Sequence, residues 1–460
     1  MSDKPKERET FSSRLGFLML SAACAVGLGN VWRFPFITGK YGGGIFVAVY
    51  LLFLLAVLPV MIMEFAVGRA SKRSLGLSFH VLEKPGSSWH KLGWVSLVGC
   101  YSLMMFYTTI SGWMLKYGLA MAQGKTQCLD PNGIGLYFGQ MLKDPVAQIV
   151  GMTITTVSCF AINALGLRRG VERVIKWMML ALFLLLVILV GRVIFLPNAS
   201  AGISYFLWPD LERFTAASPI EICNAAMSQA FFTLGIGIGT MATIGSYYTK
   251  EKSLTGEAFW VAGLDTVVAI LAGLIIFPAC FAFNINPDSG PGLIFITLPN
   301  VFNSMNNGNI WGTIFFLFMA FAAFSTVIAV FETIISYSQD VFNLSRPKAA
   351  IINCLILWCL SLPCALGWST FSNFVPLGPG TNILDLEDFI TSCNILPLGA
   401  IIFTLFCSLR SGWGFDRFMA EANQGSGIKL PHWIKWYLRY VLPIILIALL
   451  IAGYIHTFFK

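Results

Sequence analysis

Long apolar stretches alternate with short polar ones along almost the whole chain. Charge-free runs cover 92–115, 145–167, 222–249, 289–331, 349–384 and 440–459. A helix needs roughly 20 apolar residues to cross the hydrocarbon core of a membrane. The pattern predicts eleven membrane-spanning helices, at about 15–38, 44–69, 92–121, 146–166, 174–196, 222–248, 257–284, 310–340, 349–368, 384–409 and 437–459. The run 289–331 is too long for one span, so its Gly-, Pro- and Asn-rich first part predicts a structured outer loop.

Composition agrees with an all-α polytopic membrane protein. Hydrophobic residues make up 57% of the 460 residues and charged residues 11%, whereas soluble domains are about 25% charged. The net charge of +8 comes from Lys and Arg that gather in alternate loops rather than on one surface. By the positive-inside rule, this places the N-terminus in the cytoplasm and the C-terminus outside. The lipid bilayer is therefore an expected partner, and nucleic acid is not.

Two of the predicted spans contain residues that ordinary membrane helices avoid. Their sequences are Gly27-Leu28-Gly29-Asn30, with Arg33 and Pro35 beyond, and Gly235-Ile236-Gly237-Ile238-Gly239. Glycine costs about 1 kcal/mol in a helix interior, and an arginine inside a membrane needs a protein or water partner. Glycine is also common where membrane helices only pack closely. Paired breaks in corresponding spans are nevertheless the pattern that marks a transporter's binding site.

The position of the two breaks predicts the organisation of the chain. They fall in the first and sixth spans, and an odd number of five spans per unit predicts an inverted 5+5 repeat. The expected parts are a cytoplasmic N-terminal segment, a first five-helix repeat, a second five-helix repeat and an additional eleventh helix, at residues 1–14, 15–196, 222–410 and 437–459.

Polar side chains stand beside the predicted breaks. Unwound backbone exposes N–H groups that suit a carboxylate and carbonyl groups that suit a small cation. Asn30, Thr233 and Asp265 would add oxygens to one cation site, and the adjacent Ser325 and Thr326 to another. Ser and Thr in membrane helices more often bond their own backbone or join helices. Their coincidence with a mid-membrane Asp265 favours a binding site.

Cysteine and histidine usage argues against a zinc or redox site. The eleven cysteines are scattered, with no Cys-x-x-Cys pair. The four histidines, His80, His90, His432 and His456, lie outside the centres of the predicted spans. No zinc site is therefore expected from these spacings.

The chain resembles the neurotransmitter:sodium symporter family over nearly its whole length. The residues that carry the resemblance are Ala25 to Pro35, Gly42-Gly43-Gly44, Pro59 to Arg69 and Phe231-Phe232-Thr233-Leu234. The eleven-span length is similar to that of bacterial members. The resemblance implies a symporter of a bacterial inner membrane, in which the inward flow of Na+, with two ions expected, drives the uptake of an amino acid.

The resemblance also implies which residues bind the ions and the substrate. The first sodium site would use the Ala25 carbonyl, Asn30, Thr233, Asp265 and the substrate carboxylate. The second would use the carbonyls of Ala23, Val26 and Ala322 with the hydroxyls of Ser325 and Thr326. The substrate would contact Ala25, Leu28, Gly29, Leu103, Tyr107, Phe232, Thr233, Gly235, Ile238, Thr326 and Val330. An outer gate would pair Arg33 with Asp388, and an inner gate would pair Arg8 with Asp340.

Gly27 and Asp265 limit the expected class of substrate and the ions that transport is expected to require. Gly27 stands where amine-transporting members carry an aspartate, so the substrate should bring its own carboxylate, as an amino acid does. Asp265 stands where asparagine is usual, close to the place where chloride-dependent members bind Cl−. A fixed negative charge disfavours an anion there, so chloride-independent transport is expected. The apolar pocket, enlarged at Gly235, favours a hydrophobic amino acid, with aromatic ones ahead.

Other functions receive less support from the sequence. No ring-forming filter indicates a channel, and no metal-ligand cluster or Ser–His arrangement indicates an enzyme. A proton-coupled amino-acid transporter of the same architecture, with Asp265 titrating, stays open as the alternative. Glu64 and Glu332 are expected to bond the unwound backbone N–H groups of the broken helices, or else to carry a proton; Glu332 could also take part in closing the inner gate.

Overall fold

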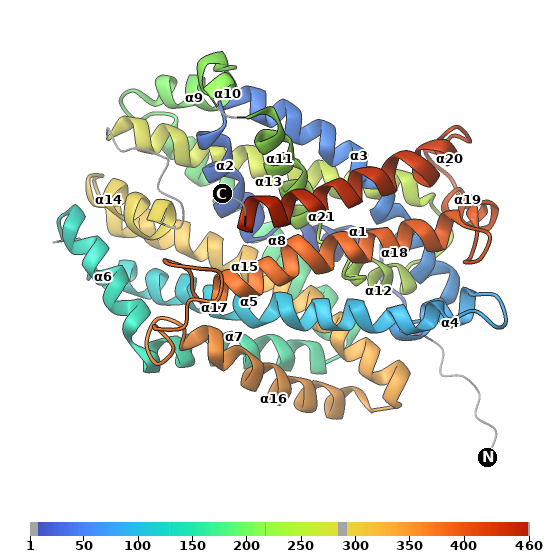
Figure 1. Cartoon of the computed structure of the whole chain (residues 1–460). Helices are drawn as coiled ribbons and strands as arrows, with labels where there is room; N and C mark the ends of the chain where they lie inside the picture. The colour runs from blue at the N-terminus through green and yellow to red at the C-terminus, as the bar shows by residue number, and fades with distance from the viewer. Residues whose placement is uncertain (1–7, 128, 217, 284–291, 459–460) are drawn as a thin grey trace.

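The computed structural model describes residues 8–127, 129–216, 218–283 and 292–458. Within these ranges the chain is helical, and β-type pairing is limited to two isolated bridges, Gly43 with Pro209 and Lys252 with Ser426. The long helices lie side by side, roughly along one common axis, and form a single bundle (Figure 1). The expected all-α architecture is confirmed.

Nine helical runs in the described ranges are long and apolar enough to cross a membrane. They are Gly44–Ser71 (α3), Trp89–Ala122 (η2 and α5), Pro145–Ala164 (α7), Leu167–Val193 (η3 and α8), Leu254–Ala282 (α13), Gly308–Phe342 (α15), Arg346–Ala365 (α16), Ile383–Ser408 (α17, η5 and α18) and Ile434–Ile455 (α20, η6 and α21). The pair Arg14–Ala25 (α1) and Gly29–Lys40 (η1 and α2), bent by 51°, adds a tenth. Each of these coincides with a predicted span to within four residues at either end, except that Leu167–Val193 begins seven residues before the predicted 174–196.

The remaining predicted span, 222–248, is divided in two. It consists of α11 (Pro219–Leu234) and α12 (Thr240–Ser246), separated by Gly235 to Gly239. Neither piece reaches the roughly 20 residues that a membrane crossing requires. The count of eleven spans, and the inverted repeat that depends on it, therefore stay predictions.

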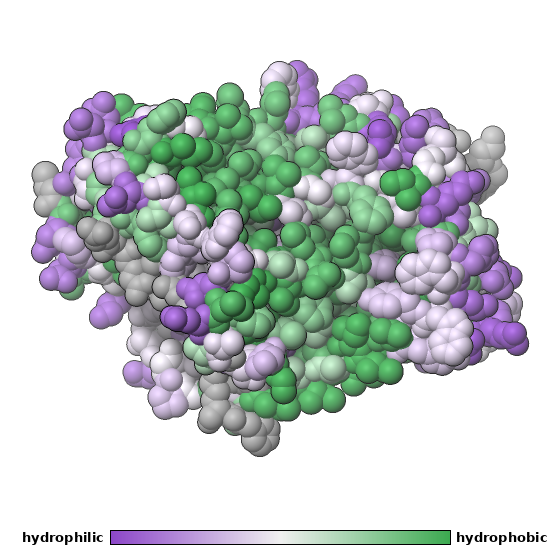
Figure 2. Space-filling model, turned by 90° about the horizontal axis from the view of Figure 1, so that it is seen from above, coloured by the Kyte–Doolittle hydropathy of each residue, from purple (hydrophilic) through white to green (hydrophobic). Residues whose placement is uncertain are grey.

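A hydrophobic belt crosses the middle of the bundle on one face. Figure 2 shows apolar residues over the centre of this face and polar residues gathered towards its two ends. Large apolar side chains are also exposed on α8, α16 and α21, among them Leu184, Ile351 and Ile444, each at least 60% exposed. Because soluble monomers rarely expose contiguous apolar surface on this scale, the belt marks the surface that lipid covers.

Short helices close the two ends of the bundle. One end carries α6 (Pro131–Lys143), α9 (Ala199–Leu207), α10 (Leu211–Ala216) and α14 (Leu298–Asn303); the other carries α4 (Leu75–Leu82) and α19 (Phe415–Ala422) (Figure 1). We call the second of these the α4 end. The long run 289–331 divides as predicted, since η4 (Leu293–Thr297) and α14 precede the long α15.

Glycines allow the central helices to approach closely. A Cβ atom on Gly68 of α3 would lie 1.7 Å from the Ala242 carbonyl oxygen of α12, and one on Gly112 of α5 would lie 2.6 Å from the Gly151 carbonyl carbon of α7. Small residues at such contacts are the usual way that membrane helices pack. The short α12 is thereby held against α3, next to the break that precedes it.

Candidate functional site

Both helix breaks lie in the buried centre of the bundle. After α1 ends at Ala25, the Gly27 N–H donates to Asn30 Oδ1 (3.0 Å), and the Leu28 N–H donates to the Tyr107 hydroxyl oxygen (2.9 Å). After α11, residues Gly235, Gly237 and Gly239 adopt φ values of 58°, 95° and 71°. Only glycine enters this left-handed region freely, which explains the alternating glycines of the second break.

A small cavity lies between the two breaks. Its lining consists of Cys24, Ala25, Gly27, Gly29, Leu103, Tyr107, Phe232, Gly235, Ile238, Thr326, Val330 and Leu396. Nine of these are among the predicted substrate-binding residues. Of the remaining predicted ones, Leu28 contributes its N–H to Tyr107 and Thr233 faces Asp265. Leu396 was missed because it comes from the start of α18, where no polar or glycine signal marks it.

The cavity is apolar except for two hydroxyl groups that flank Gly27. A Cβ atom on Gly27 would lie 2.3 Å from Tyr107 Oη and 2.7 Å from Thr326 Oγ1. Because Gly27 has no side chain, these two hydroxyl groups can occupy the space beside it. A carboxylate entering the cavity would find hydroxyl and backbone donors at this corner and apolar side chains elsewhere.

Asp265 of α13 is the centre of a buried polar cluster. Asn30 Nδ2 donates to Asp265 Oδ1 (2.8 Å), Thr233 Oγ1 donates to the same oxygen (3.0 Å), and the Tyr50 hydroxyl donates to Oδ2 (3.3 Å). All four side chains are at most 1% exposed. Within the described ranges, no Lys or Arg nitrogen lies within 4.0 Å of this carboxylate. A buried carboxylate without a cation is costly, so the cluster suits a bound cation.

Carbonyl oxygens converge on Thr326 of α15. Its Oγ1 lies 3.0 Å from the Ala23 carbonyl oxygen and 3.3 Å from those of Val26 and Ala322. The neighbouring Ser325 Oγ lies 3.0 Å from the Ala322 oxygen. One hydroxyl proton cannot serve three carbonyl acceptors at once, whereas a hard cation takes several oxygen ligands. The structure thus brings together, from α1 and α15, the oxygen atoms predicted for the second cation site.

Replacing Thr326 by alanine tests this oxygen cluster. We expect the Na+ concentration for half-maximal uptake to rise roughly 10- to 100-fold, because a hydrogen bond or ligand to a charged group contributes about 1.5–3 kcal/mol. The measurement is the Na+ dependence of uptake into proteoliposomes. Thr326→Ser keeps the hydroxyl and should stay near the wild type. An unchanged Na+ dependence in Thr326→Ala would remove Thr326 from the ion site.

The α4 end of the bundle is closed by a network around Arg8. Its guanidinium pairs with Asp340 of α15 (2.7 Å), donates to Ser246 of α12 (2.8 Å) and Ser336 (2.6 Å), and covers the Tyr247 ring at 4.7 Å. The structure thus brings the predicted inner-gate residues together. The segment before α1 thereby ties α12, which follows the second break, to α15.

We expect Arg8→Ala to loosen this end, because breaking a largely buried ion pair costs roughly 3–5 kcal/mol. Hydrogen–deuterium exchange should rise in residues 240–248, which Arg8 holds through Ser246. Arg14 is a matched control, since it pairs with Glu257 at 2.9 Å from the same segment. Equal exchange in Arg8→Ala and Arg14→Ala would contradict a specific gate at Arg8.

The predicted outer-gate pair is not formed. Arg33 donates to Ser228 (2.9 Å) and covers the Phe232 ring at 4.9 Å, while Asp388 accepts from Ser392 (2.6 Å). Among the residues that the structure describes, these two charges approach no closer than the 4.0 Å limit of an ion pair. The structure therefore pairs the charges of the predicted inner gate but not those of the predicted outer gate.

Glu64 and Glu332, the two buried glutamates that the sequence analysis singled out, differ in their partners. Glu64 Oε1 accepts the Gly237 N–H (2.5 Å) in the middle of the second break, as expected. The expectation that Glu332 would bond unwound backbone was wrong. Its carboxylate accepts from the Tyr247 hydroxyl (2.7 Å) and from the Arg346 guanidinium, next to the Arg8 network. This location beside the Arg8 network is the one expected if Glu332 takes part in closing the inner gate, and its two partners come from separate segments, Tyr247 after α12 and Arg346 of α16.

A pocket between two broken helices, with a buried carboxylate and converging carbonyl oxygens beside it, defines a secondary transporter within a multi-pass membrane protein. Comparisons with known proteins agree. The model of the sodium:neurotransmitter symporter family matches residues 8–128 and 136–458. The chain belongs to this family, and it is therefore a sodium-coupled symporter.

Individual relatives cover nearly all of the chain. A sodium-dependent transporter of Bacillus subtilis, YhdH, is 32% identical over 95% of this chain and 96% of its own length. The sodium-dependent neutral amino acid transporter B(0)AT2 of Pongo abelii is 22% identical over 99% of this chain and 74% of its own. The crystal structure of MhsT in complex with L-phenylalanine superposes with a TM-score of 0.86, at 35% identity, over 97% of this chain and 100% of that one.

Proposed function

We propose that the protein imports a hydrophobic amino acid, with aromatic ones favoured, together with two Na+ ions and without a chloride requirement. The observation that carries the proposal is the buried Asp265 carboxylate, which has hydrogen-bond donors around it but no Lys or Arg within 4.0 Å in the described ranges. A sodium ion at this position would neutralise the charge inside the bundle. The substrate carboxylate, entering beside Gly27, would be its second anionic ligand.

Support for the substrate comes from the cavity and from two relatives. Leu103, Phe232, Ile238 and Val330 give the cavity apolar walls. MhsT binds L-phenylalanine in its crystal structure, and B(0)AT2 is named for neutral amino acids. An apolar pocket distinguishes side chains that differ by one methylene by only about 1–3 kcal/mol. Several hydrophobic amino acids are therefore expected as substrates.

The proposed coupling between Na+ and substrate follows from the groups that each of the two ions would contact. The first ion would touch the substrate carboxylate, so each would raise the affinity of the other by the same factor. The second, at Thr326, would join α1 to α15, and its release would allow the α4 end to open. A ligand shifts such an equilibrium only through its different affinities for the two states.

The moving parts would be the two five-helix units, 15–196 and 222–410. We place the α4 end and the N-terminus in the cytoplasm and the C-terminus outside, because Lys and Arg concentrate in the loops of that end. The membrane would be the inner membrane of a bacterium. Uptake would thus begin from the end where Arg33 and Asp388 lie.

The decisive experiment reconstitutes the purified protein in proteoliposomes. We expect uptake of labelled phenylalanine to require an inward Na+ gradient, and competition to follow the order aromatic, then large aliphatic, with glycine and charged amino acids ineffective. Uptake driven by a pH gradient without Na+ would favour the proton-coupled alternative instead. A preference for glycine or a charged amino acid would contradict the proposed pocket.

A further inference from the structure

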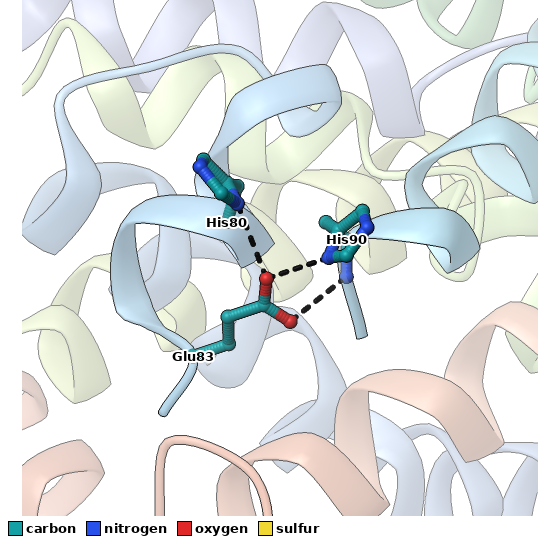
Figure 3. Close-up of side chains that lie close together, drawn as sticks. All are labelled: His80, Glu83 and His90. Atoms are coloured by element: carbon teal, nitrogen blue, oxygen red, sulfur yellow. Dashed lines mark hydrogen bonds and ion pairs between the residues drawn. The ribbon is translucent and has the colours of Figure 1, made fainter. Parts of the chain in front are cut away.

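Two histidines and a glutamate meet at the surface of the α4 end. His80 lies on α4, Glu83 ends this helix, and His90 belongs to η2 (Trp89–Leu92). Figure 3 shows both imidazole rings turned towards the same carboxylate. The Nδ1 atoms of His80 and His90 lie 3.2 and 2.6 Å from Glu83 Oε1. We call these three residues the His–Glu–His cluster.

We propose that the His–Glu–His cluster binds a divalent transition-metal ion of the Zn2+ class. Its three ligand atoms lie within 4.8 Å of one another. Zinc ligands stand about 2.0–2.1 Å from the ion, which places neighbouring ligand atoms roughly 3.3 Å apart in a tetrahedral site. Rotation of the two imidazoles, which are 68% and 39% exposed, is enough to reach this spacing. Water would complete the coordination.

The carboxylate is held in place for this role by its second oxygen. Glu83 Oε2 accepts from the Ser87 hydroxyl (2.7 Å) and from the His90 backbone N–H (3.1 Å), while Oε1 faces the rings. A carboxylate held in this way beside two mobile imidazoles is a partly preorganised metal site.

The donor set selects the class of ion. Imidazole nitrogen suits Zn2+, Cu2+ and Ni2+, whereas Ca2+ and Mg2+ prefer oxygen ligands only. Each histidine would bind through Nδ1 and carry its proton on Nε2. This proposal departs from the expectation of no zinc site, which rested on the scattered cysteines and on histidines outside the centres of the predicted spans. The ten-residue separation of His80 and His90 matches no common metal motif, and the turn between them brings the rings together.

Titration with Zn2+ tests the site. The full-length protein is purified with an affinity tag that contains no histidine, and Zn2+ binding is followed by isothermal titration calorimetry. We expect one equivalent in the wild type, and binding weaker by at least about tenfold, the scale seen when even a supporting residue is lost, in His80→Ala and in His90→Ala. His432→Ala, which removes an exposed histidine elsewhere, is the matched control and should bind as the wild type does.

Three outcomes would overturn the proposal. They are the absence of Zn2+ binding, binding that persists in the double variant His80→Ala/His90→Ala, and binding of Ca2+ as tight as that of Zn2+. Since His80 is exposed and His90 is half-buried at the surface, their replacement should leave folding unchanged. Unaltered thermal unfolding of the variants without Zn2+ verifies this, so weaker binding can be assigned to the lost ligands.

The His–Glu–His cluster lies where a bound ion would influence the predicted inner gate, the pair of Arg8 and Asp340. At the start of α4, the Ser74 N–H donates to Asp340 Oδ2 (2.5 Å), the carboxylate that pairs with Arg8. At the cluster, the Trp89 indole N–H donates to the Ser411 carbonyl (3.1 Å). A metal ion that fixes α4 to η2 would stabilise the hydrogen bonds of Ser74 with Asp340 and of Trp89 with Ser411. It would thereby favour the arrangement in which Asp340 is paired with Arg8.

This effect rests on the proposed transport function and has its own test. Zn2+ on the α4 side should slow Na+-driven uptake in the wild type and leave the double variant unaffected. Equal slowing of both proteins, or none in either, would contradict the link to the gate, while calorimetry decides the site separately. A wild type without uptake in the absence of Zn2+ would instead count against the proposed function.

Discussion

Replacing Asp265 by alanine should reduce Na+-driven uptake by roughly 100-fold or more, because loss of one member of a buried charge pair costs about 3–5 kcal/mol. Asp265 is fully buried and accepts hydrogen bonds from Asn30, Thr233 and Tyr50. In the proposed mechanism its charge balances the first Na+ ion. The measurement is the initial rate of labelled phenylalanine uptake, with Asp416→Asn, an exposed position on α19, as the control.

The asparagine variant separates the charge from the oxygen ligand. Asp265→Asn keeps one carbonyl oxygen but removes the negative charge, so uptake should fall in chloride-free buffer and recover in part when chloride is added. Wild-type uptake should be the same in both buffers. Chloride stimulation of the wild type would contradict chloride independence, and full activity of Asp265→Ala would contradict the sodium site itself.

Adding a single methyl group at Gly27 should weaken substrate binding by about 5- to 100-fold. A Cβ atom there would meet Tyr107 Oη at 2.3 Å and Thr326 Oγ1 at 2.7 Å, and overpacking of a buried site costs about 1–3 kcal/mol. The measurement is the affinity for labelled phenylalanine in Gly27→Ala at saturating Na+.

A second substitution shows whether the clash is the cause. Tyr107→Phe removes the nearer of the two hydroxyls, so Gly27→Ala should cost less in that background than in the wild type. This double-mutant cycle measures the coupling directly. Additive losses would mean that the methyl group acts elsewhere, for example through the backbone of the break.

Much of the fold could be predicted from the sequence, because membrane-spanning helices are long apolar runs and charged residues concentrate in the loops between them. Ten of the predicted spans coincide with helices or the bent pair of the structure. The breaks were also visible, since Gly27 and Gly235 to Gly239 interrupt spans in which glycine is costly. For the same reason, nine of the predicted substrate residues line the cavity.

The features that could not be predicted from the sequence depend on contacts between segments that are distant in the chain. Leu396 lines the cavity although it lies in an ordinary apolar helix. Glu332 bonds the side chains of Tyr247 and Arg346 rather than unwound backbone N–H groups. The approach of His80 to His90 depends on a turn whose path no periodic pattern encodes. The predicted pairing of Arg33 with Asp388 is not formed in this structure, because each side chain bonds a nearby serine instead.

The position of Arg8 has a practical consequence for protein engineering. This residue reaches α12 and α15 from a segment that precedes the first helix by only a few residues, since α1 begins at Arg14. A fusion partner or surface attachment near the N-terminus would pull on the same segment. Labels and immobilisation tags therefore belong at the far end of α21, which lies away from the α4 end (Figure 1).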